Sequence, residues 1–204
     1  YQGHGNVAHP HGILITWAVI MEGGVQVNCE GRRFWNETKG YSEAARAVLA
    51  QPKGEACAIF DCRIAEVARQ FEDFKQAEAA GAIKVSATLK GLAGELGLPV
   101  GPFVEAMNAI PEDGPDLFGR IFKSPTLKAP YFGVRVTGAL FHTQGGLRTG
   151  ENARVYRADG TLFPNLFACG GAACGVSGCG DSGYLSGNGL LSAVVLGKLA
   201  GEER

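Results

Sequence analysis

The sequence predicts an α+β unit, followed by a β-hairpin, a glycine-rich loop and a closing helix. Three observations predict this fold class. Residues 28–127 combine helical apolar periods with short apolar strands. A long β-type run follows Pro130. Glycine accounts for 31 of the 204 residues, about twice the usual share, and is especially dense over 170–189.

The N-terminal elements follow from apolar runs and breakers. Residues 1–27 predict a loop, then a buried helix within 13–21, then a strand over 25–27 after Gly23 and Gly24. A helix begins at Ser42, whose hydroxyl is a typical N-cap, and the apolar run 56–61 predicts a strand.

The next elements are mostly helical. Residues 64–80 predict one charged, alanine-rich helix that ends at Gly81. Thr88 is expected to cap a short helix over 89–96, and a further helix runs from Pro99 to Ile110.

The C-terminal part changes character. Residues 131–142 predict a long strand, and segments 153–156 and 165–168 flank an Asp159-Gly160 turn, which favours a hairpin. The glycine-rich loop follows, and residues 190–200 predict a buried helix.

Composition excludes several classes of protein. A formal net charge of −1 and a pI near 6.5 provide no basic surplus for nucleic-acid binding. The longest apolar run, 13–21, is too short to span a bilayer. The six cysteines form no CxxC pair, so we expect reduced, buried thiols, no metal site and a cytoplasmic protein, although a preceding signal segment would change the location.

The segment 166–191 predicts a strand, a glycine loop and a helix start. Amides in the first turn of a helix carry partial positive charge, and glycines let a ligand approach the backbone. We therefore expect an electron-rich ligand such as a phosphate, a carboxylate or a flavin pyrimidine edge. The GxGxxG match at 178–183 is discounted, because too little chain follows it for a βαβ unit.

Several separated motifs, in order along nearly the whole chain, resemble the FAD-dependent fumarate reductase/succinate dehydrogenase flavoprotein family and the related ketosteroid dehydrogenases. The quoted segments are 8–10, 27–28, 31–37, 116–120, 142–147, 159–160, 165–170 and 186–191. The resemblance implies a fragment: 1–27 leads from the FAD domain, 28–127 forms an α+β cap over the substrate, and 128–204 is the C-terminal part of an incomplete Rossmann-type α/β FAD domain. The remaining N-terminal FAD-binding region is then the implied partner, without which this fragment would hold FAD poorly.

The resemblance also implies site residues. His9 and His142 fall on the two substrate histidines, while Tyr41 and Tyr184 stand where fumarate reductases have arginines. The FAD contacts would be Gly170, Gly171, Gly187, Asn188, Gly189, Leu190 and Leu191, with Asn188 also the expected N-cap. Gly171 replaces an acidic FAD contact of the family, which weakens that one position.

These substitutions change the expected substrate. A phenol cannot copy the bidentate guanidinium–carboxylate pair, although it still donates a hydrogen bond or a proton. The sequence thus favours hydride transfer between flavin N5 and a C–C or C=C bond beside a carbonyl, in a small, largely apolar ketosteroid-like or cyclic enone molecule. The alternatives are a fumarate reductase/succinate dehydrogenase-type dicarboxylate enzyme and a non-catalytic binding module on the same scaffold. Arg32, Arg33 and Glu37 are predicted to form ion pairs of the cap fold.

Overall fold

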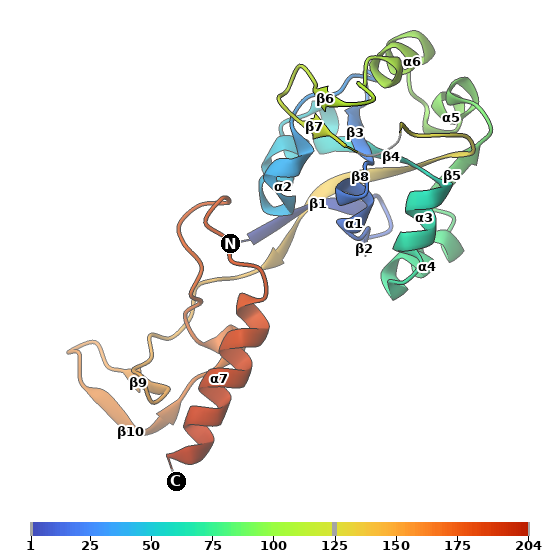
Figure 1. Cartoon of the computed structure of the whole chain (residues 1–204). Coiled ribbons are helices and arrows are strands. Elements are labelled where there is room, and N and C mark those ends of the chain that lie inside the picture. Colours follow the sequence, from blue (N-terminus) through green and yellow to red (C-terminus); the bar gives the residue numbers. More distant parts are fainter. Residues whose placement is uncertain (1, 124–125, 204) are drawn as a thin grey trace. The chain divides into compact units, whose positions relative to one another are not determined.

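The computed structural model describes residues 2–123 and 126–203, which form a mixed α/β chain of two compact units (Figure 1). The larger unit spans residues 3–139 and the smaller contains residues 140–203. The larger unit extends beyond the predicted 28–127 domain at both ends, because strands from both flanks complete its sheet.

The large sheet has the strand order β2-β1-β8-β4-β3, and β5 also pairs with β8. Its strands are β1 (Gln2–Ala8), β2 (Ile13–Leu14), β3 (Val25–Asn28), β4 (Glu55–Asp61), β5 (Ile83–Ser86) and β8 (Tyr131–His142). The antiparallel pairs β3–β4 and β4–β8 place Val27 opposite Cys57 and Ala58 opposite Val134. The predicted strands at 25–27, 56–61 and 131–142 are confirmed.

Two helical layers cover the faces of the sheet, and β4 contributes to both cores because alternate side chains point to opposite faces. Phe60 packs with α2 (Tyr41–Leu49), α3 (Cys62–Ala68) and α4 (Glu72–Ala79). Ile59 packs with α5 (Leu89–Leu96) and α6 (Val100–Asn108). The shorter elements are α1 (Ala18–Met21), η1 (Glu37–Lys39), η2 (Pro52–Gly54), β6 (Gly114–Pro115) and β7 (Ile121–Phe122).

The predicted single helix over 64–80 is wrong, since the chain forms α3 and α4 with a break at Phe71. The reason is the direction of the buried side chains. At about 100° per residue, a straight helix would turn Phe74 and Ala77 roughly away from Ile64 and Ala68. All four residues lie in the same core, so the helix must break between them.

Three smaller expectations concern where elements begin. The predicted N-terminal loop contains the strand β1, and the predicted helix within 13–21 shrinks to α1 because residues 13–14 pair with β1. Ser42 is not an N-cap: α2 starts at Tyr41, and its N-cap is Gly40, whose φ of 132° favours glycine. Thr88 does cap α5, since its hydroxyl accepts a hydrogen bond of 3.0 Å from the Gly91 amide.

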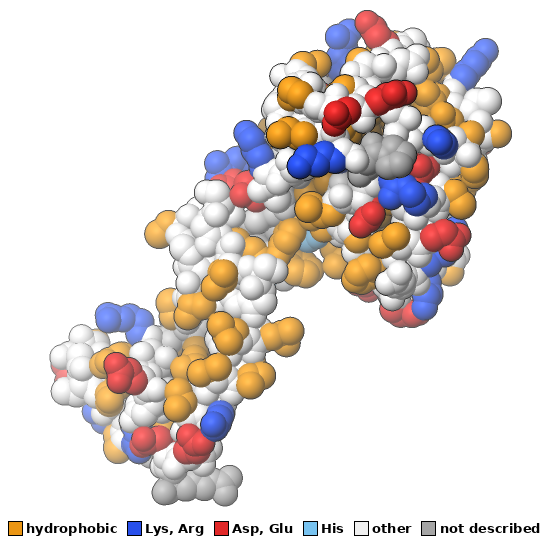
Figure 2. Space-filling view, viewed as in Figure 1, with side chains coloured by type: hydrophobic (Ala, Val, Ile, Leu, Met, Phe, Trp, Pro, Cys, Tyr) orange, Lys and Arg blue, Asp and Glu red, His pale blue; other side chains and the backbone are white. Residues whose placement is uncertain are grey.

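The smaller unit holds the predicted hairpin, formed by β9 (Arg154–Tyr156) and β10 (Leu162–Phe167), then η3 (Gly170–Ala172) and the helix α7 (Asn188–Glu202). Leu196 of α7 packs on a small core of Val155, Ala168 and Ala173. The prediction that the closing helix is buried is wrong for the side of α7 that carries Leu190 and Val194, which are 79% and 70% exposed. Figure 2 shows hydrophobic side chains gathered over the region of α7.

The cysteines are free thiols, but burial is confirmed only for Cys57. Cys29 is half-buried, and the exposed thiols are Cys62, Cys169, Cys174 and Cys179. Cys62 begins α3 directly after β4, and the other exposed thiols lie in or beside the glycine-rich stretch before α7. Within the described ranges, no helix is long and apolar enough to cross a bilayer, and no three His, Cys, Asp or Glu side chains gather as a metal site.

Candidate functional sites in the two units

The start of α7 exposes backbone donors. Its N-cap is Gly187, which has no side chain to accept a hydrogen bond from the first turn. The first amide with a full helical bond is that of Leu191, which donates to the Gly187 carbonyl at 2.9 Å. The amides of Gly189 and Leu190 lie before it, in the turn where helices leave donors without intrahelical partners. These two amides and the helix dipole suit an electron-rich ligand.

The remaining predicted cofactor contacts lie around this helix. Gly170 has a φ of 55° and begins η3, and a Cβ there would come within 3.3 Å of the Ala193 methyl group. The space beside Gly171 is open. Gly170 is therefore a packing glycine that seats η3 on α7, whereas Gly171 leaves room for a ligand.

Asn188 is not the N-cap but the first residue of α7, and its side chain is 1% exposed. Its Oδ1 accepts a hydrogen bond of 3.0 Å from the Val176 amide, and its Nδ2 donates to Gln144 Oε1. Gln144 Nε2 lies 2.6 Å from Nδ1 of His142. His142 thus belongs to a polar chain that reaches the start of α7, and the prediction had missed Gln144.

Tyr184 lies half-buried in the loop between η3 and α7, in the same unit as His142. A hollow of about 550 Å³ also borders α7, on the side of Gly175, Leu191 and Ser192. The helix start, its polar chain and this hollow make one candidate ligand site within residues 140–203.

Three rings form a second cluster, in the larger unit. Tyr41 stacks on His4 with ring centroids 5.0 Å apart, and Trp17 meets both rings edge-on at 5.7 and 6.1 Å. Burial lowers the pKa of His4 from 6.5 to about 4, so its ring is neutral at physiological pH. Its Nδ1 accepts a hydrogen bond of 3.2 Å from the Asn6 amide, which leaves the ring proton on Nε2.

The structure places His9 elsewhere. It follows the end of β1, its side chain is 43% exposed, and its Nε2 lies 3.5 Å from Glu55 Oε1. The histidine that contacts Tyr41 is therefore His4, which the sequence prediction passed over. A prediction of β1 as a strand would have pointed to His4, because alternate residues of a strand share a face and Tyr41 begins the helix beside β1.

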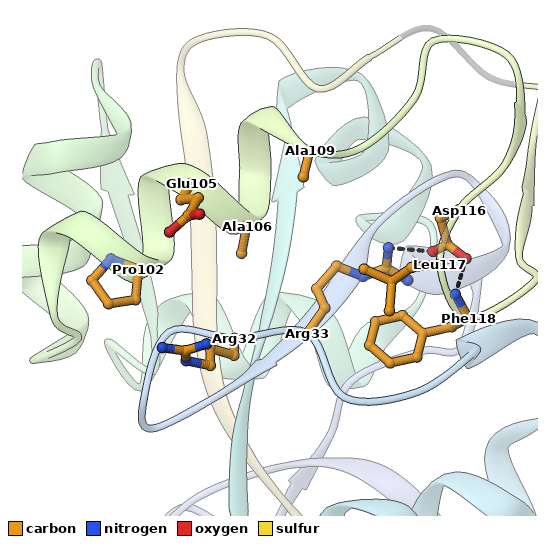
Figure 3. Close-up of a pocket in the computed structure, with 9 residues that line it drawn as sticks. All are labelled: Arg32, Arg33, Pro102, Glu105, Ala106, Ala109, Asp116, Leu117 and Phe118. Carbon is orange, nitrogen blue, oxygen red and sulfur yellow. Dashed lines mark hydrogen bonds and ion pairs between the residues drawn. The ribbon is translucent and has the colours of Figure 1, made fainter.

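A third region joins buried charges around Glu37, whose side chain is fully buried. Its carboxylate accepts hydrogen bonds of 2.7 Å from Arg33 and 2.9 Å from Arg120. Arg33 also pairs with Asp116, as Figure 3 shows. Burial raises the pKa of Asp116, but the Arg120 amide and the Arg33 guanidinium outweigh it and hold the pKa below its usual value.

Arg33 and Asp116 line a pocket of about 270 Å³, together with Arg32, Phe118 and side chains of α6 (Figure 3). The predicted ion pairing is confirmed for Arg33 and Glu37, whereas Arg32 is exposed and forms no ion pair within the described residues. The Arg33 guanidinium is already paired with two carboxylates, Glu37 and Asp116, so its charge stabilises the fold of the larger unit.

Comparison with known proteins identifies the family of this chain. The family described as "FAD binding domain" matches residues 3–190. A fumarate reductase (cytochrome) of Shewanella frigidimarina is 29% identical over 207 residues, which is 99% of this chain and 35% of that protein. A 3-oxosteroid 1-dehydrogenase of Mycobacterium tuberculosis is 27% identical over 194 residues, 76% of this chain and 34% of that protein.

Among solved structures, the open conformation of a flavocytochrome c3 fumarate reductase matches with a TM-score of 0.75 and 27% identity, over 99% of this chain and 36% of that one. The chain thus spans about a third of the length of the curated relatives it matches. The match over residues 3–190 includes both the Tyr41 cluster and the start of α7. The chain belongs to the FAD-binding flavoprotein family that contains the fumarate reductases.

Proposed function

We propose that the protein containing this chain is an FAD-dependent oxidoreductase. It transfers hydride between flavin N5 and a C–C or C=C bond next to a carbonyl, in a largely apolar substrate. Bound FAD would supply the hydride acceptor or donor. The support comes from the family match, from relatives of both the fumarate reductase and 3-oxosteroid dehydrogenase types, and from an uncharged aromatic cluster in the larger unit.

The residues at the start of α7 fit the cofactor. The Gly189 and Leu190 amides would donate to the electron-rich edge of the ring system, and the absence of side chains at Gly171 and Gly187 leaves the backbone open. Backbone donors make this contact independent of side-chain identity. Leu191 borders the hollow beside the helix and would contribute apolar contact.

We propose that the rest of the FAD-binding domain covers the apolar side of α7. Leu190, Leu191, Val194 and Val195 are each at least 45% exposed on this one helix. Burying the exposed part of such a side chain stabilises an interface by about 1–2 kcal/mol. Residues 1–27 and 128–204 would then belong to the FAD domain and 28–127 to the cap, with β1 and β8 shared by the cap's sheet.

The observation that carries the substrate class is the packing of Tyr41 and Trp17 against the buried ring of His4. A dicarboxylate needs fixed cations, and His4 stays uncharged down to about pH 4. Tyr41 and Tyr184 supply phenols where fumarate reductases use arginine. A phenol donates one hydrogen bond, which suits a carbonyl oxygen, and aromatic faces suit an apolar body. His142 would be a further donor to the substrate.

A fumarate reductase is the second candidate. It is favoured by the match over 99% of the chain to the Shewanella protein. The cluster opposes it, because its neutral histidine offers no charge to offset the desolvation of a carboxylate.

Full-length protein reconstituted with FAD tests the proposal. We expect anaerobically reduced flavin to be reoxidised by a cyclic enone or an unsaturated 3-ketosteroid, and not by fumarate. Tyr41→Phe and Tyr184→Phe should each lower turnover by about 100-fold if the phenols act as proton donors. Tyr131→Phe, on β8, is the matched control. Tight binding of fumarate or succinate would reject the substrate class, and failure of every acceptor to reoxidise the flavin would indicate a non-catalytic module.

A further inference from the structure

The polar chain at the start of α7 has a direction set by the backbone. Val176 donates its amide proton to Asn188 Oδ1 at 3.0 Å, and a backbone amide can only donate. The Asn188 side chain must therefore present its NH₂ group to the next member. That member is Gln144, whose Oε1 accepts from Asn188 Nδ2.

The same logic carries on to the histidine. Because Gln144 Oε1 is the acceptor for Asn188, Gln144 presents Nε2, a donor, to Nδ1 of His142 at 2.6 Å. A ring nitrogen that accepts a hydrogen bond carries no proton. The proton of the neutral ring is then on Nε2.

Two glycines make room for this arrangement. A Cβ at Gly175 would overlap Gln144 Oε1 and come within 3.1 Å of Asn188 Nδ2. A Cβ at Gly189 would come within 3.1 Å of His142 Nε2 and 3.4 Å of its Cε1. The ring thus lies against the first turn of α7, beside the Gly189 amide. The backbone of Gln144 is also held, since its carbonyl accepts from the Gly175 amide at 2.9 Å.

We propose that Gln144 and Asn188 are positioning residues that hold His142 as a neutral donor through Nε2. Because the Val176 amide can only donate, the hydrogen bonds through Asn188 and Gln144 determine that Nδ1 of His142 is the acceptor. The donor then lies beside the open amides of the helix start, where it would bind an oxygen acceptor. That this acceptor is the substrate carbonyl rests on the proposed function, whereas the position of the ring proton does not.

The test exchanges one group in the chain. In Asn188→Asp, the Val176 amide still donates to one carboxylate oxygen, but the other oxygen now faces Gln144. The Gln144 amide must rotate, which directs Oε1 at His142 and requires a proton on Nδ1. Gln144→Glu is the second variant: Asn188 continues to donate, and a carboxylate oxygen again faces Nδ1.

The measurement is NMR of the ring nitrogens in full-length holoprotein with ¹⁵N-labelled histidine, with His142→Gln to assign the signal. We expect an unprotonated Nδ1 in the natural protein and a protonated Nδ1 in each folded variant. Asn165→Asp, on an exposed position of β10, is the matched control and should leave the signal unchanged. A protonated Nδ1 in the natural protein, or an unprotonated Nδ1 in either folded variant, would overturn the proposal.

This readout needs neither substrate nor turnover. An unexpected ring-proton position rejects the positioning role even if the carbonyl substrate is correct. The expected position together with inactivity toward cyclic enones rejects the substrate class and keeps the positioning role.

Discussion

Acidification should destabilise the larger unit through one side chain, His4. Burial lowers its pKa from 6.5 to about 4 in the folded chain. Between these two pH values the unfolded chain binds a proton at this histidine and the folded chain does not. Lowering the pH therefore stabilises the unfolded state, and the loss begins near pH 6.5, grows down to about pH 4 and then stops growing.

The expected loss follows from the difference between the two pKa values. A difference of about 2.5 corresponds to about 3 kcal/mol of unfolding free energy. Other carboxylates and histidines also titrate over this range, so the effect of His4 must be isolated. His4→Phe keeps an aromatic ring against Tyr41 but never binds a proton, and it loses the acceptor for the Asn6 amide. At pH 7 the variant should be less stable by about 1 kcal/mol or more.

The assay is urea unfolding followed by tryptophan fluorescence at several pH values from 7 to 4. Both tryptophans of the chain, Trp17 and Trp35, lie in the larger unit, so the signal reports on it. The natural chain should lose about 3 kcal/mol more than His4→Phe over this range and become the less stable protein near pH 4. The control is His9→Phe, at an exposed histidine. If His4→Phe and the natural chain lose stability in parallel, the account of His4 is wrong.

Three further changes test other parts of the structure. Glu37→Gln should cost about 3–5 kcal/mol of unfolding free energy, measured in urea, because it leaves the buried Arg120 guanidinium without its carboxylate and Arg33 with Asp116 alone; a loss under about 1 kcal/mol would contradict this. Gly175→Ala should lower the unfolding free energy by about 1–3 kcal/mol, because the added methyl group displaces Gln144. If both the stability and the His142 NMR signals are unchanged, the close packing of Gly175 against Gln144 is wrong. Burial raises the pKa of the Cys57 thiol to about 12, so mass spectrometry should find it alkylated at least about 100-fold more slowly than the exposed Cys62; equal rates would refute its burial.

The sequence predicted an element best where the residues of that element alone carry a clear hydrophobic pattern or cap. The strand β4 follows from an apolar run bounded by Pro52 and Asp61, and α5 follows from the Thr88 cap. The strand β1 carries no such pattern, since Gly3 and Gly5 weaken its β propensity. Both glycines lie where α2 approaches closely, because a Cβ on either would overlap Ala45 or Ala44. Tertiary packing, which the sequence does not display, selects glycine there.

In the candidate sites too, local features were predicted from the sequence, whereas contacts between distant residues were not. The glycine-rich stretch before α7 was found from composition and from the expected helix start. The partners of His142 were not, because Gln144 and Asn188 are 44 residues apart and meet only through folding. The sequence prediction named His9 in place of His4 because β1, which carries His4, contains glycines and was not predicted as a strand. Long-range polar contacts and strand faces are the features that required the structure.

Each candidate site, taken by itself, bears on the proposed substrate class. At the Tyr41 cluster, a histidine that stays neutral to about pH 4 lies among aromatic rings. At the start of α7, the proposed polarity of the chain from Val176 keeps His142 neutral, with its Nε2 proton available. Neutral donors discriminate weakly between acceptor oxygens but do not offset the desolvation of a carboxylate. Each site taken by itself therefore supports the proposed carbonyl substrate, because neither histidine provides the cation that a carboxylate needs.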